Sequence, residues 1–345
     1  MKSLYKKILE EVNENHITTE LKTRNGKVLI IDGLNTFIRA WTTNPSMNED
    51  GDHIGGIIGF LNSVAFQIRE FNPTRVIITF DGKGGSDSRK KLYEGYKSDR
   101  GKNRFRVNRQ YADMMNEEEE RQSMKQQFVW LNDILNHLPV KVMMYDGIEA
   151  DDVIAYLTMD VIHGEVIIVS TDKDFLQLVD DRITVYSPTK KRLYNRNLIF
   201  EEYGIWPQNI LMYRVLDGDT SDGIKGIQGC ALKTILKRFP EFSQDRLITH
   251  DELFSLAENR RGELKIYDSI LNNKEQVLLN KRLMELDISH IPKLQRLQIL
   301  DRFNENDPSL NKKNFLAVGM KYKLLASWKD LMGWLNSSFG SLIVK

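Results

Sequence analysis

The sequence contains very little cysteine and no long apolar run. Its only cysteine is Cys230, so the chain can form no internal disulfide bond and no cysteine-based zinc site. No apolar run approaches the roughly 18 residues of a membrane-spanning helix. Residues 1–15 mix Lys and Glu and lack the apolar core of a secretion signal. We therefore expect a soluble protein of a reducing compartment, the cytoplasm, with no membrane partner.

The sequence also has almost no excess of one charge over the other: its formal net charge is only +1 at pH 7. A nucleic-acid-binding protein with so little net charge must concentrate its basic residues in one region and balance them elsewhere. The composition, 41% hydrophobic and 28% charged, is that of a globular protein. The chain has 345 residues, a length at which we expect about two domains. The distribution of charge along the chain is therefore more informative than its sum.

Four short apolar runs, each followed within a few residues by acids, dominate the first half of the chain. The runs alternate with segments of helical periodicity, which indicates βαβ units and a mostly parallel sheet. They cover residues 28–31, 76–80, 140–145 and 166–170, and the helical segments cover residues 57–70, 125–137 and 152–162. Because sites in such sheets lie beyond the carboxyl ends of the strands, we expect the acids to meet at one edge.

These acids, with two more further along the chain, are suited to a metal site. A single aspartate after a strand is often a helix N-cap, but capping does not require clusters. Carboxylates gathered in one cleft repel each other unless cations lie between them, and oxygen ligands favour Mg²⁺, for which Mn²⁺ can substitute. So many ligands predict two or more ions, a pair of which can clamp the attacking and leaving oxygens at phosphorus. The candidate metal ligands are Asp32, Asp81, Glu149, Asp151, Asp152, Asp172, Asp174, Asp219 and Asp222.

A long basic segment separates the second and third of these strands. Residues 89–109 hold nine basic residues and two acids, with Tyr93, Tyr96 and Phe105 interleaved. Four consecutive glutamates follow at residues 117–120. Connections between α/β units are usually short, so an insertion at about residues 84–124 is either functional or a solvated linker. Positive charge combined with aromatic residues favours contact with nucleic acid.

Three evenly spaced glycines, Gly223, Gly226 and Gly229, precede a segment of helical periodicity at residues 231–239. Glycine lets backbone N–H groups approach a phosphate closely, and the following helix N-terminus adds a favourable dipole. Such a hairpin grips one duplex backbone without reading its sequence. A plain turn would also explain the glycines. Asp219 and Asp222, directly before them, favour the hairpin because they would connect the duplex grip to the metal site.

Six segments carry a further signal in their order and spacing. They read VLIIDGLN from Val28, TFDGK from Thr79, YKSDR from Tyr96, GIEADD from Gly147, STDKDF from Ser170 and GDTSDGIKGIQG from Gly218. Together they resemble the flap endonuclease (5′-nuclease) family, and in particular its stand-alone phage members, the 5′-exonuclease and ribonuclease H. The resemblance spans about residues 26–240 and is weaker toward residue 292.

The resemblance implies a Mg²⁺-dependent 5′-to-3′ exonuclease and flap endonuclease that removes RNA primers or flaps during DNA replication or repair. It implies a first metal group of Asp32, Asp81, Glu149 and Asp151 with Asp152. A second group would be formed or supported by Asp172, Asp174, Asp219 and Asp222. The catalytic residues would be Lys97, which contacts the scissile phosphate, and Arg100, which assists it.

The same resemblance implies the substrates and partners. These are DNA and RNA–DNA duplexes with 5′ flaps or ends, and the replication role suggests a single-strand-binding protein or a replication clamp. A helical arch would enclose the single strand, and a potassium ion would be held by backbone carbonyls of the glycine hairpin. We expect a monomer, in the host cytoplasm if the chain is phage-encoded. The expected DNA-binding residues are Arg39, Arg89, Tyr96, Lys97, Arg100, Gly223, Gly226, Gly229 and Lys233.

The predicted fold class is α/β, with a mostly parallel central sheet, helices on both faces and a helical arch insertion. An N-terminal extension (residues 1–25) precedes a PIN-like catalytic domain (26–205). A helical C-terminal domain (206–345) contains a helix–hairpin–helix-like (H3TH) duplex-binding motif at about residues 208–240.

Two other functions are compatible with parts of this pattern. A metal-dependent phosphatase would need Asp-x-Asp after the first strand, where this chain has Asp32, Gly33 and Leu34. A non-catalytic structure-specific DNA-binding scaffold would keep the basic segment and the hairpin. It would have no reason to keep nine acids near phosphates, because their repulsion lowers affinity.

Overall fold

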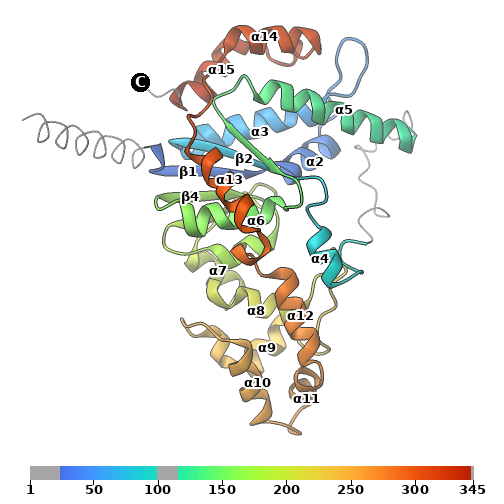
Figure 1. Ribbon diagram of the computed structural model, residues 1–345, viewed down its shortest axis with the longest axis vertical. Coiled ribbons are helices and arrows are strands. Elements are labelled where there is room, and N and C mark those ends of the chain that lie inside the picture. The colour runs from blue at the N-terminus through green and yellow to red at the C-terminus, as the bar shows by residue number, and fades with distance from the viewer. Residues whose placement is uncertain (1–23, 99–115, 343–345) are drawn as a thin grey trace, which may run out of the picture.

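A six-stranded sheet lies at the centre of the computed structural model, which describes residues 24–98 and 116–342. Its strand order is β3-β2-β1-β4-β5-β6 (Figure 1), and all neighbouring strands are parallel except β5 and β6. The strands are β1 (Lys27–Asp32), β2 (Arg75–Asp81), β3 (Lys141–Tyr145), β4 (Glu165–Val169), β5 (Ile183–Ser187) and β6 (Arg192–Tyr194).

Alternate residues of the central strand β1 face opposite sides of the sheet, as pleated geometry requires. Val28 and Ile30 belong to one buried cluster, whereas Leu29 and Ile31 belong to another. The strand is therefore covered on both faces. This explains why its apolar residues form a continuous run instead of alternating with polar ones.

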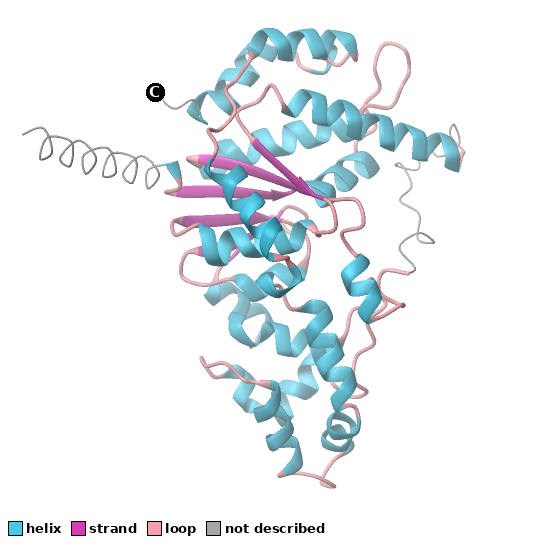
Figure 2. Ribbon diagram, in the orientation of Figure 1, coloured by secondary structure: helices cyan, strands magenta, loops and turns pink. Residues whose placement is uncertain are grey.

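Helices cover both faces of the sheet, as Figure 2 shows. The face of Leu29 is covered by α2 (Gly33–Thr43), α3 (Gly55–Phe71), α5 (Glu117–Leu135), α14 (Lys312–Lys321) and α15 (Leu331–Phe339). The other face is covered by α6 (Ala150–Tyr156), α7 (Arg196–Tyr203) and α8 (Pro207–Asp217). Across the described ranges, every helix is too short or too polar to span a bilayer.

The remaining helices extend away from the sheet and then return to it. Helices α9 (Leu232–Arg238), α10 (His250–Glu258), α11 (Lys265–Asn272) and α12 (Lys274–Met284) form the lower end of Figure 1. The short helix α4 (Asp87–Leu92) lies against α12, and α13 (Lys293–Asn304) runs back to β3. Residues from the end of the chain thus pack against strands formed near its beginning.

The sequence predicts four of the six strands correctly and misses β5 and β6. Strand β5 alternates buried and half-buried side chains and β6 has three residues, so neither forms a continuous apolar run. The helix predicted at residues 152–162 begins at Ala150 and ends in a π-helical turn, Leu157–Val161. The predicted α/β class, with a mostly parallel sheet covered on both faces, is confirmed.

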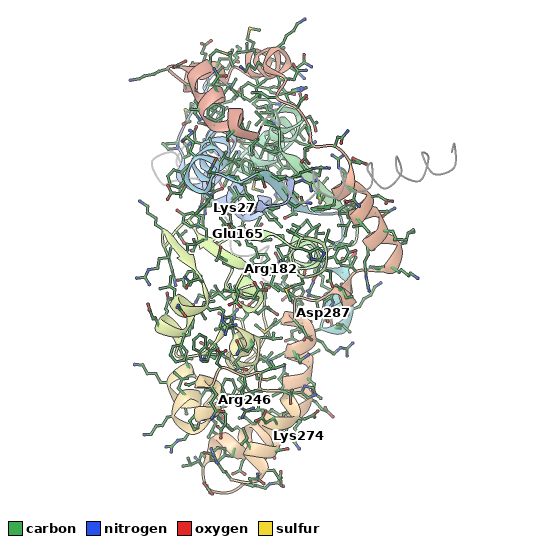
Figure 3. All side chains as sticks on the ribbon, turned by 90° about the vertical axis from the view of Figure 1, so that its left-hand side faces the viewer. Lys27, Glu165, Arg182, Arg246, Lys274 and Asp287 are labelled. Carbon is green, nitrogen blue, oxygen red and sulfur yellow. The ribbon has the colours of Figure 1, made fainter. Side chains whose placement is uncertain are left out.

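The order of the strands reverses at the centre of the sheet, between β1 and β4. Lys27 lies opposite Glu165 in the register of these strands, and their side chains form an ion pair of 3.5 Å at the amino edge (Figure 3). Strand β2 lies on the other side of β1. Such a switch point leaves a crevice beyond the carboxyl ends of the strands, so a site is expected next to the ends of β1 and β4.

The amino edge of the sheet carries a cluster of cations around one carboxylate. Arg75 and Lys141 are the first residues of β2 and β3, and both are buried. Arg24, Arg75 and Lys141 approach the carboxylate of Asp307 with nitrogen–oxygen distances of 2.7, 2.9 and 3.5 Å. Lys141 also donates to backbone carbonyls at the end of α13, at 2.7 Å. This cluster, the amino-edge clamp, fastens the C-terminal part of the chain to the sheet.

Replacing Asp307 by alanine should destabilise the fold, because Arg75 and Lys141 would stay buried without their counter-ion. Breaking a buried ion pair typically costs 3–5 kcal/mol, and since the Asp307 side chain is 23% exposed we expect a loss of about 2 kcal/mol in urea unfolding at neutral pH. Burial alone would raise the pKa of Asp307, but Arg24 and Arg75 outweigh it and lower that pKa. The stabilisation that Asp307 provides is therefore lost as the pH falls through the lowered pKa.

The exposed Asp301 on α13 provides the matched control. Asp301→Ala should change the free energy of unfolding by no more than about 0.5 kcal/mol. Equal losses in the two variants would mean that the clamp contributes nothing specific.

Candidate active site at the carboxyl edge

Asp32 ends β1 at the predicted crevice and caps the first turn of α2. Its Oδ1 accepts a hydrogen bond from the Asn35 N–H at 3.1 Å, and its Oδ2 accepts one from the Ser170 hydroxyl at 2.9 Å. The Asn35 amide donates to the Thr171 hydroxyl at 2.7 Å. These bonds join the carboxyl ends of β1 and β4, and they place Asp172 in the neighbouring turn.

The end of β2 is joined to α6 in a similar way. Asp81 accepts a hydrogen bond from the Ala150 N–H at 2.7 Å, which fixes the start of the helix. Asp151 lies in the first turn of that helix. Asp32 is therefore a helix N-cap, and Asp172 caps the short helical turn Lys173–Leu178, whereas Asp81 bonds the start of α6 from outside that helix. Capping does not account for Asp151.

Electrostatic coupling shows that the acids of different strands meet. Burial raises the pKa of Asp32 to about 7, and the charges of Asp172 and Asp81 add to the effect. Burial also raises the pKa of Asp151 well above its ordinary value, with further contributions from Asp172, Asp32 and Asp81. Four acids from three strand ends and one helix start thus act on one another, as the sequence predicts.

Asp174 and Asp219 form a second group around an arginine. The Arg214 guanidinium on α8 contacts Asp174 at 3.1 Å and Asp219 at 2.5 Å. Burial and the charge of Asp172 raise the pKa of Asp174 to about 7 although Arg214 acts against them. The sequence gives no signal for Arg214, which is the single basic residue of α8 and belongs to no motif.

Glu149 and Asp152 form ion pairs with basic side chains. Arg89 donates from Nη1 to Glu149 at 2.6 Å and from Nη2 to Asp152 at 2.7 Å, and the Lys97 ammonium also pairs with Glu149. Burial would raise the pKa of Glu149, but Lys97 and Arg89 outweigh it, so the pKa is lowered. The Tyr96 hydroxyl donates to the same carboxylate at 3.2 Å.

Two residues expected to contact DNA are therefore placed inside the protein. Arg89 is 1% exposed and Tyr96 is 4% exposed. In the sequence both belong to a basic and aromatic segment, which predicts a nucleic-acid surface, and nothing in that pattern shows that they turn inward. Arg100 lies outside the described residues. Lys97, at the edge of the arch insertion, reaches Glu149 together with Arg89 and Tyr96.

Within the described residues, no three carboxylates bring their oxygens close enough together to share one metal ion. Eight of the nine predicted ligands instead divide into three sets. Asp32, Asp81, Asp151 and Asp172 influence one another, Asp174 and Asp219 share Arg214, and Glu149 and Asp152 share Arg89. Asp222 contributes its backbone carbonyl to the Lys97 N–H at 2.9 Å.

The glycine hairpin is a tight turn closed by paired backbone hydrogen bonds between Asp219 and Ile224. Gly226 lies against the end of α8, where an added Cβ would be 2.1 Å from the carbonyl oxygen of Asp217. Gly229 has a φ of +88° and open space around it, and Lys233 is exposed in the first turn of α9. The hairpin thus combines a backbone accessible to a ligand with a nearby cation.

Arg39 lies on α2, partly buried. Its Nη2 donates to the Ser63 hydroxyl at 3.2 Å, while its buried Nη1 has no hydrogen-bond partner among the described residues. Burial lowers the pKa of Arg39, although the charge of Asp32 acts against this effect. The side chain is thus held close enough to Asp32 for the two charges to interact.

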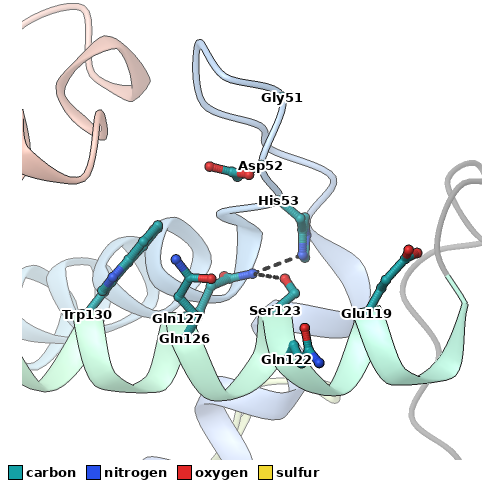
Figure 4. A pocket seen from close by; sticks show the side chains of 9 residues that line it. All are labelled: Gly51, Asp52, His53, Glu119, Gln122, Ser123, Gln126, Gln127 and Trp130. Carbon is teal, nitrogen blue, oxygen red and sulfur yellow. Dashed lines mark hydrogen bonds between the residues drawn. The ribbon is translucent and has the colours of Figure 1, made fainter.

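A polar pocket of about 230 Å³ lies between the loop before α3 and the outer face of α5 (Figure 4). Gln127 accepts from the Gly56 N–H at 2.9 Å and donates to Ser123 at 3.2 Å, with His53 at 3.1 Å. Gln127 thereby caps α3, whose N-cap residue offers no side-chain bond. The network anchors α5, the helix that follows the undescribed part of the arch insertion.

A family model and individual known proteins both match this chain. Residues 27–204 match the family model described as 5′-3′ exonuclease, N-terminal resolvase-like domain. A 5′-3′ exonuclease of Buchnera aphidicola subsp. Acyrthosiphon pisum is 31% identical over 282 residues, covering 79% of this chain and 90% of that protein. DNA polymerase I of Caldicellulosiruptor bescii is 26% identical over 266 residues, which cover 74% of this chain. The matched part spans only 28% of that polymerase.

Solved structures support the fold. The phage T5 D15 protein, co-crystallised with metal ions, superposes with a TM-score of 0.60 at 20% identity. The superposition covers 85% of this chain and 99% of that protein. The family model spans more than half of this chain, and the Buchnera relative is matched over nearly its whole length. The chain belongs to the 5′-3′ exonuclease family.

Proposed function

We propose that this chain hydrolyses phosphodiester bonds at or near the 5′ ends of DNA strands, as a 5′-to-3′ exonuclease and flap endonuclease. The observation that carries the proposal is the convergence of Asp32, Asp81, Asp151 and Asp172 at the carboxyl edge of the sheet, beside Lys97. The relatives named 5′-3′ exonuclease support the same reaction. In this proposal the chain hydrolyses RNA–DNA duplexes, as formed by replication primers, by the same reaction.

The acids fit divalent cations such as Mg²⁺ or Mn²⁺. Hard carboxylate oxygens are the ligands that these ions prefer, and the raised pKa values of Asp32, Asp151 and Asp174 show repulsion and desolvation that a cation would relieve. We propose that the ions are held by the acids that influence one another, with Asp174, Asp219 and Asp222 in support. When bound, they neutralise the charge that develops on the phosphate during hydrolysis.

The side chains around the acids have separate tasks in this proposal. Lys97 would contact the scissile phosphate, and for this its ammonium must leave Glu149 Oε1, so that this oxygen can join the ligands while Arg89 holds Oε2. Arg89 stays buried and fixes Glu149 and Asp152 relative to the arch. The hairpin with Gly229 would grip the duplex through backbone N–H groups.

Further features of the proposal extend the resemblance. Arg39 would lie near the 5′ end of the strand, and the hairpin carbonyls would hold a potassium ion. The single-strand-binding or clamp partner, the monomeric state and the cytoplasmic location stay predictions.

A 5′-flap duplex labelled at the flap end tests the proposal. Incubation with Mg²⁺ should release short labelled fragments and incubation with EDTA should release none, and the fragment sizes separate flap cutting from stepwise exonuclease action. Asp172→Asn should abolish cleavage and leave duplex binding nearly unchanged, whereas Asp160→Asn, at an exposed position, should cleave normally. A wild-type protein that binds the duplex but cleaves it with neither Mg²⁺ nor Mn²⁺ would instead be a DNA-binding scaffold.

Lys97→Ala should slow the chemical step more than it weakens binding, because a contact made to the transition state lowers the rate. We expect roughly a 100-fold lower single-turnover rate constant with a change in duplex affinity of only a few-fold. The exposed Lys90 on α4 provides the comparison, since its loss should affect affinity alone. A Lys97→Ala defect that disappears at excess enzyme would show a pure binding role.

The raised pKa of Asp32 predicts how stability depends on pH and metal. In EDTA the folded chain binds a proton at Asp32 more tightly than the unfolded chain does, so stability falls as the pH rises from about 4 through about 7. Asp32→Asn keeps the capping oxygen and removes the charge. We expect it to be more stable than the wild type by roughly 2 kcal/mol at about pH 8 in EDTA.

This stability difference should shrink at about pH 5 and on addition of Mg²⁺, as measured by urea unfolding. Asp160→Asn should show neither effect. Identical pH dependence of wild type and Asp32→Asn would remove Asp32 from the charged cluster.

A further inference from the structure

Helix α12 contacts three of the segments that the proposed function requires, although it lies outside the residues that match the family model. Arg89 donates to the carbonyl of Leu283 at 2.9 Å. Gln177, next to the turn that holds Asp172 and Asp174, donates to the carbonyl of Met284 at 3.1 Å. Figure 1 shows α12 alongside α4 and α8, and both helices contact it.

Asn280 connects α12 to the glycine hairpin. Its side chain is fully buried, and its Nδ2 donates to the carbonyls of Val215 at 2.9 Å and Lys225 at 2.8 Å. Val215 belongs to α8 and Lys225 to the hairpin. The Gln276 amide donates to Asn280 Oδ1 at 2.7 Å, which fixes the orientation of the Asn280 amide. Asn280 thus fastens the hairpin to α8 with both of its donors.

The hairpin in turn holds the backbone of Lys97. The Lys97 N–H donates to the Asp222 carbonyl at 2.9 Å. Gly223 lies so close to the arch segment that an added Cβ would be 2.6 Å from the carbonyl oxygen of Gly95. Lys97 has a φ of +54°, which residues with a Cβ adopt infrequently. The hairpin therefore helps to set the conformation from which the Lys97 side chain extends.

The residue before Lys97 completes the connection. Tyr96 packs in one buried cluster with Ile224 of the hairpin and with Leu283 and Met284 of α12. The arch segment, the hairpin and the end of α12 therefore share a small apolar core. A displacement of the hairpin would disturb that core as well as the Lys97 backbone bond.

We propose that α12 couples duplex binding at the hairpin to the position of Lys97, and that Asn280 is the positioning residue of this coupling. A duplex held by residues 223–229 fixes Asp222 and Gly223, and through them the Lys97 backbone. A small misplacement of a group that contacts the reacting phosphate lowers the rate strongly. The coupling, which rests on the proposed function, makes cleavage conditional on the duplex beside the 5′ end.

Asn280→Ala tests the coupling because it removes the donors to Val215 and Lys225 without touching the acids or Lys97. With a 5′-flap duplex we expect the Kd to rise about tenfold, and the single-turnover rate constant at saturating enzyme to fall about tenfold. A variant that is merely less folded would need more total protein to reach saturation, and would keep the rate constant at saturating enzyme.

Asn209→Ala provides the matched control. Asn209, in the first turn of α8, is equally buried; its amide donates to the carbonyl of Arg246 and accepts from the N–H of Ile248, each at 2.8 Å. This variant should lose comparable stability but keep both the Kd and the rate constant. Equal kinetic losses in the two variants would overturn the role of Asn280.

Hydrogen exchange of the Lys97 amide in metal-free protein gives a readout that does not depend on cleavage. Duplex binding should slow this exchange in the wild type and in Asn209→Ala, and should not slow it in Asn280→Ala. If the wild type cleaves but Asn280→Ala keeps its rate constant and its protection, the coupling is wrong. If the wild type does not cleave, yet protection depends on Asn280, the coupling stands and the proposed nuclease function fails.

Discussion

Repulsion among the carboxylates at the carboxyl edge of the sheet is the constraint on which the rest of the structure depends. Asp32, Asp151 and Asp174 are displaced toward their protonated forms by burial and by neighbouring acids. Two internal arginines, Arg89 and Arg214, offset part of this repulsion, because each of them bridges two carboxylates. Neither arginine bridges Asp32, Asp81, Asp151 or Asp172. We propose that external cations relieve the repulsion within that set.

The parts of the site that could be predicted from the sequence are those that depend on residues close together in the sequence. Asp32, Asp81 and Asp172 each follow a continuous apolar strand, and parallel strands bring their carboxyl ends together whatever the rest of the chain does. The glycine spacing adds the hairpin, and the resemblance to the family adds Lys97. These features depend on local pattern and simple topology, which a single sequence records.

The features that the sequence could not show depend on distant packing. Arg89 lies in a segment with the composition of a nucleic-acid surface, and only the approach of Asp152 and Leu283 explains why it is buried. Arg214 and Asn280 lie in helices without a motif around them. Strand β5 was missed because its alternating burial gives no continuous apolar run.

The amino-edge clamp also determines where attached groups must lie. Residue 24 enters the fold at this edge, beside Asp307, and the acids lie at the opposite end of the strands. A surface tether, fluorophore or fusion partner joined close before residue 24 would therefore start on the far side of the sheet from the acids. Single-molecule measurements of strand cleavage could then anchor the protein through this end and leave the carboxyl edge open to a long DNA substrate.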